Sequence, residues 1–334
     1  HELPRLILEE REYNKANTTF INSITRYQHN GRIHGDIHPL RSDSGGTVSG
    51  RFSYSNPNLQ QIPARHKILG PLIRSIFVPE KGEKWVSIDY SQQEPRLVVH
   101  YASLLELPEV DSVVEAYKKD KADFHSIVAE MASIPRRQAK DINLGLFYSM
   151  GEKKLASQLN IPLEEAKDLF QQYHRKVPFV KMLSDYCRNR ASNKGFIRTI
   201  LGRKCRFDLW EPRQFGIGKI STFEKAQIQY GANIKRAFTH KALNRLIQGS
   251  AADQTKAAMR ELFKKNFIPL LQVHDELCFS SSDPDQIREV ANIMENCIEL
   301  SIPSKVDIEY GEDWGSAKTV FTDKPWQRSI GDGS

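Results

Sequence analysis

Residues 84–96, KWVSIDYSQQEPR, are the stretch that most constrains what this chain can fold into. Apolar and polar residues alternate up to Asp89, which is the period-two pattern of a β-strand that ends there. Glu94 and Pro95 then begin a helical pattern, and proline is tolerated in a first helical turn because its missing N–H is not needed there. A carboxylate at such a strand end could bind a divalent cation, although capping the helix is the commoner role.

A second stretch, residues 270–280 (LLQVHDELCFS), has the pattern of a tight hairpin with acidic residues at its bend. Apolar residues alternate with polar ones on both sides of His274 and Asp275. Two aspartates at strand ends could share one or two metal ions, an arrangement that favours phosphoryl transfer. Magnesium is the natural candidate because it takes few carboxylates and completes its shell with water and phosphate oxygens.

A third stretch, residues 134–151 (IPRRQAKDINLGLFYSMG), predicts a helix with a cationic stripe. Arg136, Lys140, Leu144 and Tyr148 are spaced four apart and therefore share one slowly drifting face. The two cations lie in the N-terminal half, where the helix dipole disfavours positive charge unless an anion is bound. The pattern indicates either a phosphate-binding face or a solvated basic face.

Three segments resemble, in order and spacing, motifs A, B and C of family A DNA polymerases: DYSQQEPR (89–96), RRQAKDINLGLFY (136–148) and QVHDE (272–276). This family comprises the bacterial DNA polymerase I type and its phage relatives. Further segments are similar to the family as well: SGRFSYSNPNLQQIPAR (49–65), IQGSAAD (247–253) and GEDWGSAK (311–318). The resemblance extends over about residues 1–318.

The resemblance implies an α+β fold, a polymerase right hand whose palm contains an antiparallel sheet and whose fingers are helical. It places the palm, with the thumb–palm junction helix and a primer-side segment, in 1–102 and mainly helical fingers in 103–240. A second part of the palm with the HDE hairpin would occupy 241–320, and 321–334 would be a C-terminal tail. The thumb and exonuclease domain would precede these residues, so a missing segment or a separate chain is expected to carry them.

The reaction that the resemblance implies is template-directed addition of deoxynucleoside monophosphates to a primer 3′-hydroxyl, with release of pyrophosphate. Asp89, Asp275 and the carbonyl of Tyr90 would bind two Mg²⁺ ions, for which Mn²⁺ could substitute. Glu276 lies nearer the rim and would support catalysis rather than bind metal. Lys140, a charged donor near the leaving group, is expected to act as the general acid.

The family pattern also implies contacts to both substrates, dNTPs and primer–template DNA. The incoming nucleotide would be contacted by Arg136, Lys140, His125, Gln92, Glu94, Leu144 and Tyr148. The DNA would be contacted by Arg51, Asn58, Gln60, Gln61, Arg65, Asn244, Gln248 and His274. Without the resemblance, a lone helical histidine and these loop residues would be interpreted as structural.

The chain departs from the usual letters of the family at several positions. Leu144 stands where an aromatic residue is common, which leaves the discrimination between sugars open. Gln93 and Pro95 replace an isoleucine and a leucine, Ser149 replaces a glycine, and Arg245 replaces a proline. None of these is a proposed metal ligand or phosphate-binding cation, so activity is expected to persist.

The remaining pattern predicts further elements along the chain. Helices are expected over 3–27, 155–175, 179–194 and 222–264, the last one interrupted near Gly231 and Gly249. Short strands and turns are expected over 31–78, a surface loop over 211–222 and a last strand over 304–310.

Residues 195–207, GFIRTILGRKCRF, predict a hairpin that turns near Gly202. The hairpin carries four cations: Arg198, Arg203, Lys204 and Arg206. They are either a patch that contacts the template strand or a solvated face, and the sequence leaves both possibilities open.

Composition agrees with a polyanionic partner without proving one. There are 48 Lys and Arg residues against 41 Asp and Glu, a formal net charge of +7. The four cysteines lack metal-ligand spacing and are expected to be reduced thiols. No apolar run approaches about 18 residues, so no membrane partner is expected. The expected location is the cytoplasm of a bacterial or phage-infected cell.

Three other functional classes remain open. A two-metal nuclease would share the carboxylates but would not need the cationic helix. A single-subunit RNA polymerase uses related chemistry, although Glu94 near Tyr148 argues for deoxyribose. A non-catalytic or incomplete nucleic-acid-binding fragment, dependent on a separate thumb and exonuclease chain, is the third. Pyrophosphate release and primer extension distinguish these alternatives.

Overall fold

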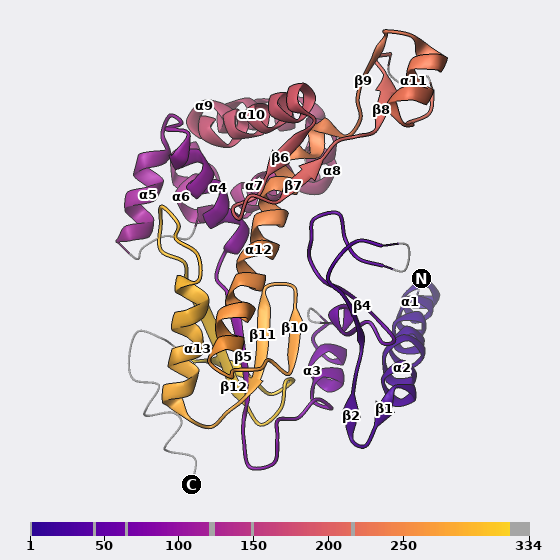
Figure 1. Cartoon of the computed structure of the whole chain (residues 1–334), viewed down its shortest axis with the longest axis vertical. Coiled ribbons are helices and arrows are strands. Elements are labelled where there is room, and N and C mark those ends of the chain that lie inside the picture. Colours follow the sequence, from indigo (N-terminus) through magenta and orange to yellow (C-terminus); the bar gives the residue numbers. More distant parts are fainter. Residues whose placement is uncertain are drawn as a thin grey trace. The chain divides into compact units, whose positions relative to one another are not determined.

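The computed structural model describes residues 2–42, 45–63, 66–119, 124–147, 150–214 and 218–320, apart from a few side chains within helices and the last strand (Figure 1). Its contacts divide the chain into two compact units. Unit 1 comprises His1–Ser91, Thr255–Cys297 and Lys305–Ser334, and unit 2 comprises Gln92–Gln254 and Ile298–Ser304. The limits of palm and fingers remain a sequence-based prediction.

Unit 1 is built on one five-stranded sheet in which all neighbouring strands are antiparallel. The strands, in spatial order, are β10 (Leu271–Val273), β11 (Glu276–Ser280), β5 (Trp85–Tyr90), β12 (Val306–Gly311) and β13 (Lys318–Val320). The predicted strands at 84–89, 270–280 and 304–310 are therefore confirmed, and β5 is the central one. An α+β fold is also confirmed.

Both faces of this sheet carry apolar cores. On one face, Val86 and Ile88 pack with Leu262 of α12 (Ala242–Lys264) and with α13 (Pro284–Asn296). Figure 1 shows α13 and the C-terminal part of α12 lying along the sheet. On the other face, Trp85 stacks on Trp314 with ring centroids 5.8 Å apart. Side chains alternate along β5, so Val86 and Ile88 point to one face of the sheet and Trp85 points to the other.

The first 78 residues supply the cover of that second face. A continuous helical run, α1 (Glu2–Lys15), a π-helical turn (Ala16–Ile21) and α2 (Asn22–Arg26), confirms the helix predicted over 3–27. Two short hairpins, a 3₁₀ turn and one helix follow: β1 (Gln28–His29), β2 (Arg32–Ile33), β3 (Asp36–His38), β4 (Ser53–Ser55), η2 (Leu59–Gln61) and α3 (Leu69–Arg74). The helix α3 was not predicted.

Unit 2 is mainly helical. Its helices are α4 (Gln93–Leu104), α5 (Val110–Lys118), α6 (Phe124–Ala132), α7 (Arg136–Phe147), α8 (Glu152–Leu159), α9 (Leu163–Lys176) and α10 (Pro178–Lys194), together with the first part of α12. The single helix predicted over 155–175 is wrong. Asn160 adopts a left-handed conformation with φ +54°, and Pro162 follows it, so α8 and α9 are separate helices.

After α10 the chain forms two small antiparallel pairs. The predicted hairpin at 195–207 is confirmed as β6 (Phe196–Arg198) and β7 (Lys204–Arg206), with Gly202 at φ +81°. The segment that follows contains β8 (Trp210–Pro212), α11 (Phe223–Tyr230), β9 (Ile234–Arg236) and η3 (Thr239–Lys241). Strand β8 therefore occupies the beginning of the predicted loop.

The helix predicted over 222–264 is only partly correct. It is interrupted at Gly231, as expected, but strand β9 follows instead of more helix. The expected interruption at Gly249 is wrong, because α12 continues through this buried residue. Its carbonyl accepts a hydrogen bond from Arg203 of the hairpin at 195–207.

Candidate active site

A row of carboxylates lies at one end of three neighbouring strands in the sheet of unit 1. Asp89 of β5 lies opposite Glu276 of β11 and opposite Asp307 of β12 in the strand register. Residues paired in this way point to the same face of a sheet. Asp275 lies at the bend between β10 and β11, immediately before Glu276. The structure therefore brings the two predicted aspartates to the same end of neighbouring strands.

The neighbouring carboxylates act on Asp89, the middle residue of the row. Solvent reaches the side chain of Asp89, yet the surrounding protein limits its hydration, and Asp275, Glu276 and Asp307 add repulsion. Together these effects raise the pKa of Asp89 to about 8. Desolvation also raises the pKa of Asp275, against an opposing attraction from Arg51. A bound cation would remove this repulsion.

The hairpin that carries Asp275 is held by a chain of amide hydrogen bonds. His274 takes the first turn position with φ +58°, which suits a two-residue hairpin loop. The amide of Gln272 donates to the carbonyl of His274, and the amide of Gln60 donates to Oε1 of Gln272 over 3.1 Å. Gln60, a predicted DNA contact, thus supports the acidic bend.

Glu276 is engaged by its own neighbours. Its Oε1 accepts hydrogen bonds from the indole Nε1 of Trp314 at 3.2 Å and from the thiol of Cys278 at 3.3 Å. These bonds orient the carboxylate from within the fold. They are consistent with the predicted supporting role of Glu276, which remains a prediction.

The predicted primer-side residues have different surroundings. Arg51 is half-buried and acts electrostatically on Asp275 and His274. The side chain of Asn58 accepts a hydrogen bond from the backbone N–H of Gln60 and caps η2, which is a structural use. Gln61 is exposed, and Arg65 lies outside the described residues.

The first predicted nucleotide contact of unit 2, Gln92, is held by two other helices. It has φ +52° just before α4, and its side-chain oxygen accepts hydrogen bonds from the backbone N–H of Phe124 and from the hydroxyl of Tyr117. The next one, Glu94, is half-buried in the first turn of α4. Gln92 thus fixes the beginning of α6, where His125 is located.

His125 belongs to a buried hydrogen-bond chain. The hydroxyl of Tyr173 on α9 donates to Oδ1 of Asn143 on α7, and Nδ2 of Asn143 lies 3.1 Å from Nδ1 of His125 on α6. Because Asn143 uses its oxygen for Tyr173, its NH₂ donates to His125. A neutral His125 then carries its proton on Nε2, which is a hydrogen-bond donor.

The cationic stripe of α7 lies beside this chain. Arg136 donates from Nε to the hydroxyl of Ser126 at 3.1 Å, which ties the beginning of α7 to the beginning of α6. Both Arg136 and Lys140 are exposed, and Asn143 follows Lys140 by three residues on the same helix face. The side chain of Leu144 and all of Tyr148 lie outside the described residues.

The remaining predicted DNA contacts, Asn244 and Gln248, are half-buried and lie one turn apart on α12. The side chain of Tyr90 is buried and donates to the carbonyl of Met294 over 2.7 Å, so only its backbone is available to a ligand. Within the described ranges, no set of three His, Cys, Asp or Glu side chains is arranged to enclose a metal ion. No described helix is both long and apolar enough to span a membrane.

Sequence reasoning missed several residues in each of the two units. Asp307 lies opposite Asp89, and Glu309, two residues further along β12, lies opposite Ser87; only the strand register shows this. Asn143 and Tyr173 were missed because a polar contact between distant helices leaves no periodic signal. The sequence does show a polar residue, Asn143, three residues after Lys140 and thus on the same face of the predicted helix.

Comparison with known proteins shows which family the chain is similar to. The family description "DNA polymerase family A" matches residues 1–316. The chain is 37% identical to a DNA-directed DNA polymerase of Pseudomonas phage M6, over 94% of this chain and 52% of the relative. It is 31% identical to the thermostable DNA polymerase I of Thermus aquaticus, over 95% of this chain and 37% of that protein.

A solved structure is similar as well: the POL domain of Pol1 from M. smegmatis in complex with DNA primer-template and dNTP. It superposes with a TM-score of 0.76 at 31% identity, covering 95% of this chain and 54% of that one. The chain thus spans about half the length of the phage relative and of this structure. On the family match and on these identities, the chain belongs to DNA polymerase family A.

Proposed function

We propose that this chain carries the nucleotidyltransferase centre of a template-directed DNA polymerase. The reaction would add deoxynucleoside monophosphates to a primer 3′-hydroxyl and release pyrophosphate. The observation that carries this proposal is the carboxylate row Glu276, Asp89 and Asp307, with Asp275 at the adjoining bend. In this proposal the sheet of unit 1 is the palm and the helices of unit 2 are the fingers of a right-hand polymerase.

The donor set at the acidic row fits a hard divalent cation. Asp89, Asp275 and the carbonyl of Tyr90 would hold it, and like-charged neighbours across strands are otherwise unfavourable. Mg²⁺ is the expected ion and Mn²⁺ a substitute. When bound, a pair of such ions acidifies the 3′-hydroxyl and neutralises charge on the triphosphate.

The residues of α6 and α7 are proposed to bind the triphosphate. Arg136 and Lys140 would neutralise the β- and γ-phosphates, and His125 would donate its Nε2–H to them. The 3′-hydroxyl gives its proton to water, its oxygen forms a bond to the α-phosphorus, and the bond from that phosphorus to the oxygen bridging to the β-phosphorus breaks. Lys140 would give its proton to the departing pyrophosphate.

The remaining predicted contacts would select and place the substrates. Glu94 and Tyr148 would exclude a ribose 2′-hydroxyl, with Leu144 near the sugar. Exposed or half-buried polar residues on several elements would contact primer and template: Arg51, Gln61, His274, Asn244 and Gln248. Gln60, Asn58 and Gln92 are proposed to act by positioning, since their side chains are used within the fold.

The test is single-nucleotide extension of a labelled primer, with pyrophosphate release measured in the same reaction. One pyrophosphate per added nucleotide is expected, and Lys140→Met should slow addition. Lys153→Met is the control, because Lys153 is an exposed cation on α8, outside the residues proposed to bind the nucleotide. Primer shortening, or equal losses in both variants, would contradict the proposal.

A further inference from the structure

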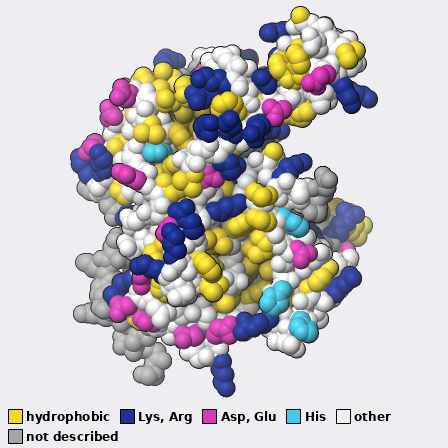
Figure 2. All heavy atoms as spheres, in the orientation of Figure 1, with side chains coloured by type: hydrophobic (Ala, Val, Ile, Leu, Met, Phe, Trp, Pro, Cys, Tyr) yellow, Lys and Arg dark blue, Asp and Glu magenta, His cyan; other side chains and the backbone are white. Residues whose placement is uncertain are grey.

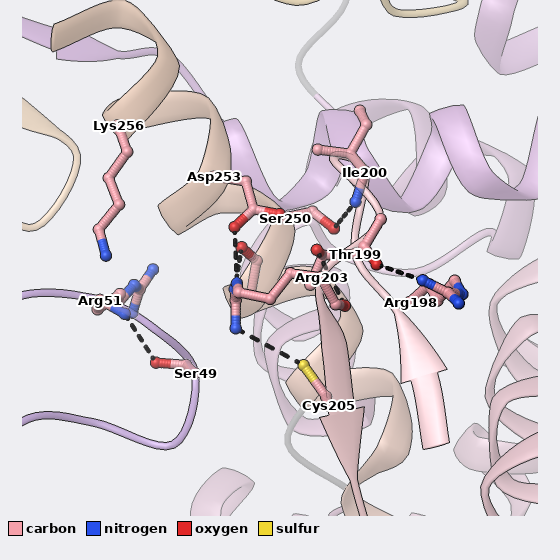
Figure 3. Close-up of polar contacts among 12 residues, drawn as sticks. Ser49, Arg51, Arg198, Thr199, Ile200, Arg203, Cys205, Ser250, Asp253 and Lys256 are labelled. Carbon is pink, nitrogen blue, oxygen red and sulfur yellow. Dashed lines mark hydrogen bonds and ion pairs between the residues drawn. The ribbon is translucent and has the colours of Figure 1, made fainter. Parts of the chain in front are cut away.

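The predicted cation patch on the hairpin β6–β7 separates into two parts. Arg203 donates from Nε to Asp253 over 3.0 Å and from its terminal NH₂ to the carbonyl of Gly249 over 2.9 Å. Figure 3 shows Arg203 directed toward Asp253, whereas Arg198 points away from it. Arg203 is therefore half-buried and structural. The other three cations, Arg198, Lys204 and Arg206, form what we call the cationic hairpin face.

The strand register places like charges together on this face. Arg198 lies directly opposite Lys204, and Phe196 lies directly opposite Arg206. The intervening pair, Ile197 and Cys205, is buried on the other side of the hairpin. Like charges at directly opposed positions destabilise a two-stranded sheet. The arrangement thus carries a cost that a bound anion would remove.

The cations are held close to one ring and lack acidic partners. Lys204 Nζ and Arg198 Cζ lie 4.9 and 5.5 Å from the centre of the Phe196 ring. Among the described residues, no carboxylate lies within ion-pair distance of the cationic hairpin face. Asp253, whose carboxylate contacts the hairpin, is paired with Arg203, and Asp208, two residues after Arg206, is exposed. All three cations are exposed.

The face continues beyond the hairpin and is too long for one phosphate group. Lys204 and Arg206 are two residues apart on an extended strand, which separates their Cα atoms by about 6.6 Å. Lys194 at the end of the preceding helix α10 is exposed as well, and Arg190, one turn earlier, is half-buried. Figure 2 shows Lys and Arg side chains gathered over this part of unit 2. A repeating polyanion fits such spacing better than a single small ion.

We propose that the cationic hairpin face binds the phosphate backbone of a DNA strand outside the site of nucleotide addition. This inference rests on the proposed function, which supplies DNA as the partner. The face contacts phosphates and carries no base-reading geometry, so its binding is independent of sequence and steeply dependent on salt. Its effect increases with the length of template strand that extends beyond the primer end.

The experiment uses the full chain and a triple variant, Arg198→Thr/Lys204→Thr/Arg206→Thr, because threonine preserves strand propensity. The control, Lys153→Ala/Lys154→Ala/Arg175→Ala, removes three exposed cations from α8 and α9 and changes the net charge equally. Affinity is measured without nucleotide, over a salt series, for primer–templates with a long and with a one-nucleotide template overhang. The thermal midpoint of each variant reports on folding.

The hairpin variant should bind the long-overhang DNA about tenfold more weakly or worse, with a salt slope smaller by about two, which corresponds to three lost phosphate contacts on a single strand. Its affinity for the short overhang and its thermal midpoint should not fall. Equal losses in the control variant, or an unchanged salt slope, would overturn the inference. Polyglutamate competing through the same three residues would also overturn it and assign the face to an acidic polypeptide.

Nucleotide addition is measured in a separate assay. If neither protein adds a nucleotide to the short-overhang primer, the proposed function fails, whereas the binding result still decides on the cationic hairpin face. If both proteins add nucleotides at equal rates at saturating DNA, and only the wild type gains affinity from the long overhang, both proposals are supported.

Discussion

Asp89 and Glu276 lie directly opposite each other where β5 pairs with β11, and Asp307 flanks Asp89 on the other side. Three carboxylates in one row are unfavourable in the folded chain alone, because opposed like charges repel. A substitution that removes one of these charges should relieve the repulsion in the folded chain, even where it abolishes activity. Stability and activity should therefore respond differently to it.

The first prediction is that Asp89→Asn abolishes nucleotide addition while the thermal midpoint does not fall. Removing a metal ligand costs several kcal/mol of transition-state stabilisation, which corresponds to a rate loss of about a thousandfold or more. Single-turnover insertion and thermal unfolding of the same sample check the two parts.

Asp307→Asn is the matched control for this prediction. It makes the same change of charge on the neighbouring strand β12, at a residue outside the proposed metal site. Near wild-type insertion is expected. If Asp307→Asn is as inactive as Asp89→Asn, the metal site has been assigned to the wrong carboxylates.

The second prediction concerns the buried chain Tyr173–Asn143–His125. Asn143→Leu removes the acceptor of the Tyr173 hydroxyl and the amide that donates to Nδ1 of His125, and each buried hydrogen-bonding group that is left unsatisfied costs about 1–3 kcal/mol. We expect the free energy of unfolding to fall by roughly 2–5 kcal/mol. Chemical denaturation measures this loss.

Tyr173→Phe completes a double-mutant cycle. In Asn143→Leu/Tyr173→Phe both partners of one hydrogen bond are replaced by apolar groups, which can be nearly neutral relative to losing one. The double variant should therefore be less destabilised than the sum of the two single variants. Strict additivity would show that the two side chains do not form this contact.

The fold could be predicted from the sequence where the pattern is local. The strand at 84–89 and the hairpin at 270–280 follow from period-two alternation, and the acidic bend follows from two adjacent polar residues. The register could not be predicted, because it joins segments more than 180 residues apart. Only the pairing of β5 with β11 and β12 shows that Glu276 and Asp307 flank Asp89.

Site residues were harder to predict where a polar side chain serves the fold. Gln60, Asn58 and Gln92 carry amides that suit DNA or nucleotide contacts, yet each hydrogen-bonds within the chain. Sequence shows that a residue is polar but not which partner it has. Arg203 illustrates the same point, since only the structure separates it from the other hairpin cations.

The third prediction concerns acid stability and His174 of α9. Its ring lies 4.5 Å from that of Phe170, and its Nδ1 is buried without a hydrogen-bond partner among the described residues. Burial, and then the charge of Lys181, lower the pKa of His174 to about 4 from the usual 6.5. Between these values the unfolded chain binds a proton that the folded chain does not, so stability is present above pH 6.5 and is lost as the pH falls.

Wild type should therefore lose about 1–2 kcal/mol of unfolding free energy through this group between pH 7 and pH 5. His174→Leu keeps the apolar contacts and removes the titration, so its stability should change less over the same interval. Urea denaturation of both proteins at the two pH values measures the difference. An identical pH dependence in both proteins would exclude His174 as the source.

The last prediction concerns the choice of sugar. Glu94 lies in the first turn of α4, and in the proposed function it meets Tyr148 beneath the sugar of the incoming nucleotide. A 2′-hydroxyl would then displace Glu94 or remain buried without a partner, at a cost of roughly 1–3 kcal/mol. Since about 1.4 kcal/mol corresponds to tenfold in rate, Glu94→Ala should raise ribonucleotide insertion by about one to two orders of magnitude.

Single-nucleotide insertion with ribo-, deoxy- and dideoxynucleotides tests this prediction on three variants. Glu94→Gln preserves the shape of the side chain and should retain most of the discrimination, so it separates exclusion by size from exclusion by charge. Leu144→Phe should mainly change the response to dideoxynucleotides, because an aromatic ring offers the sugar a flat wall that leucine does not. If the ribo-to-deoxy ratio of Glu94→Ala equals that of wild type, another residue excludes the 2′-hydroxyl, and Glu94 does not lie beneath the sugar.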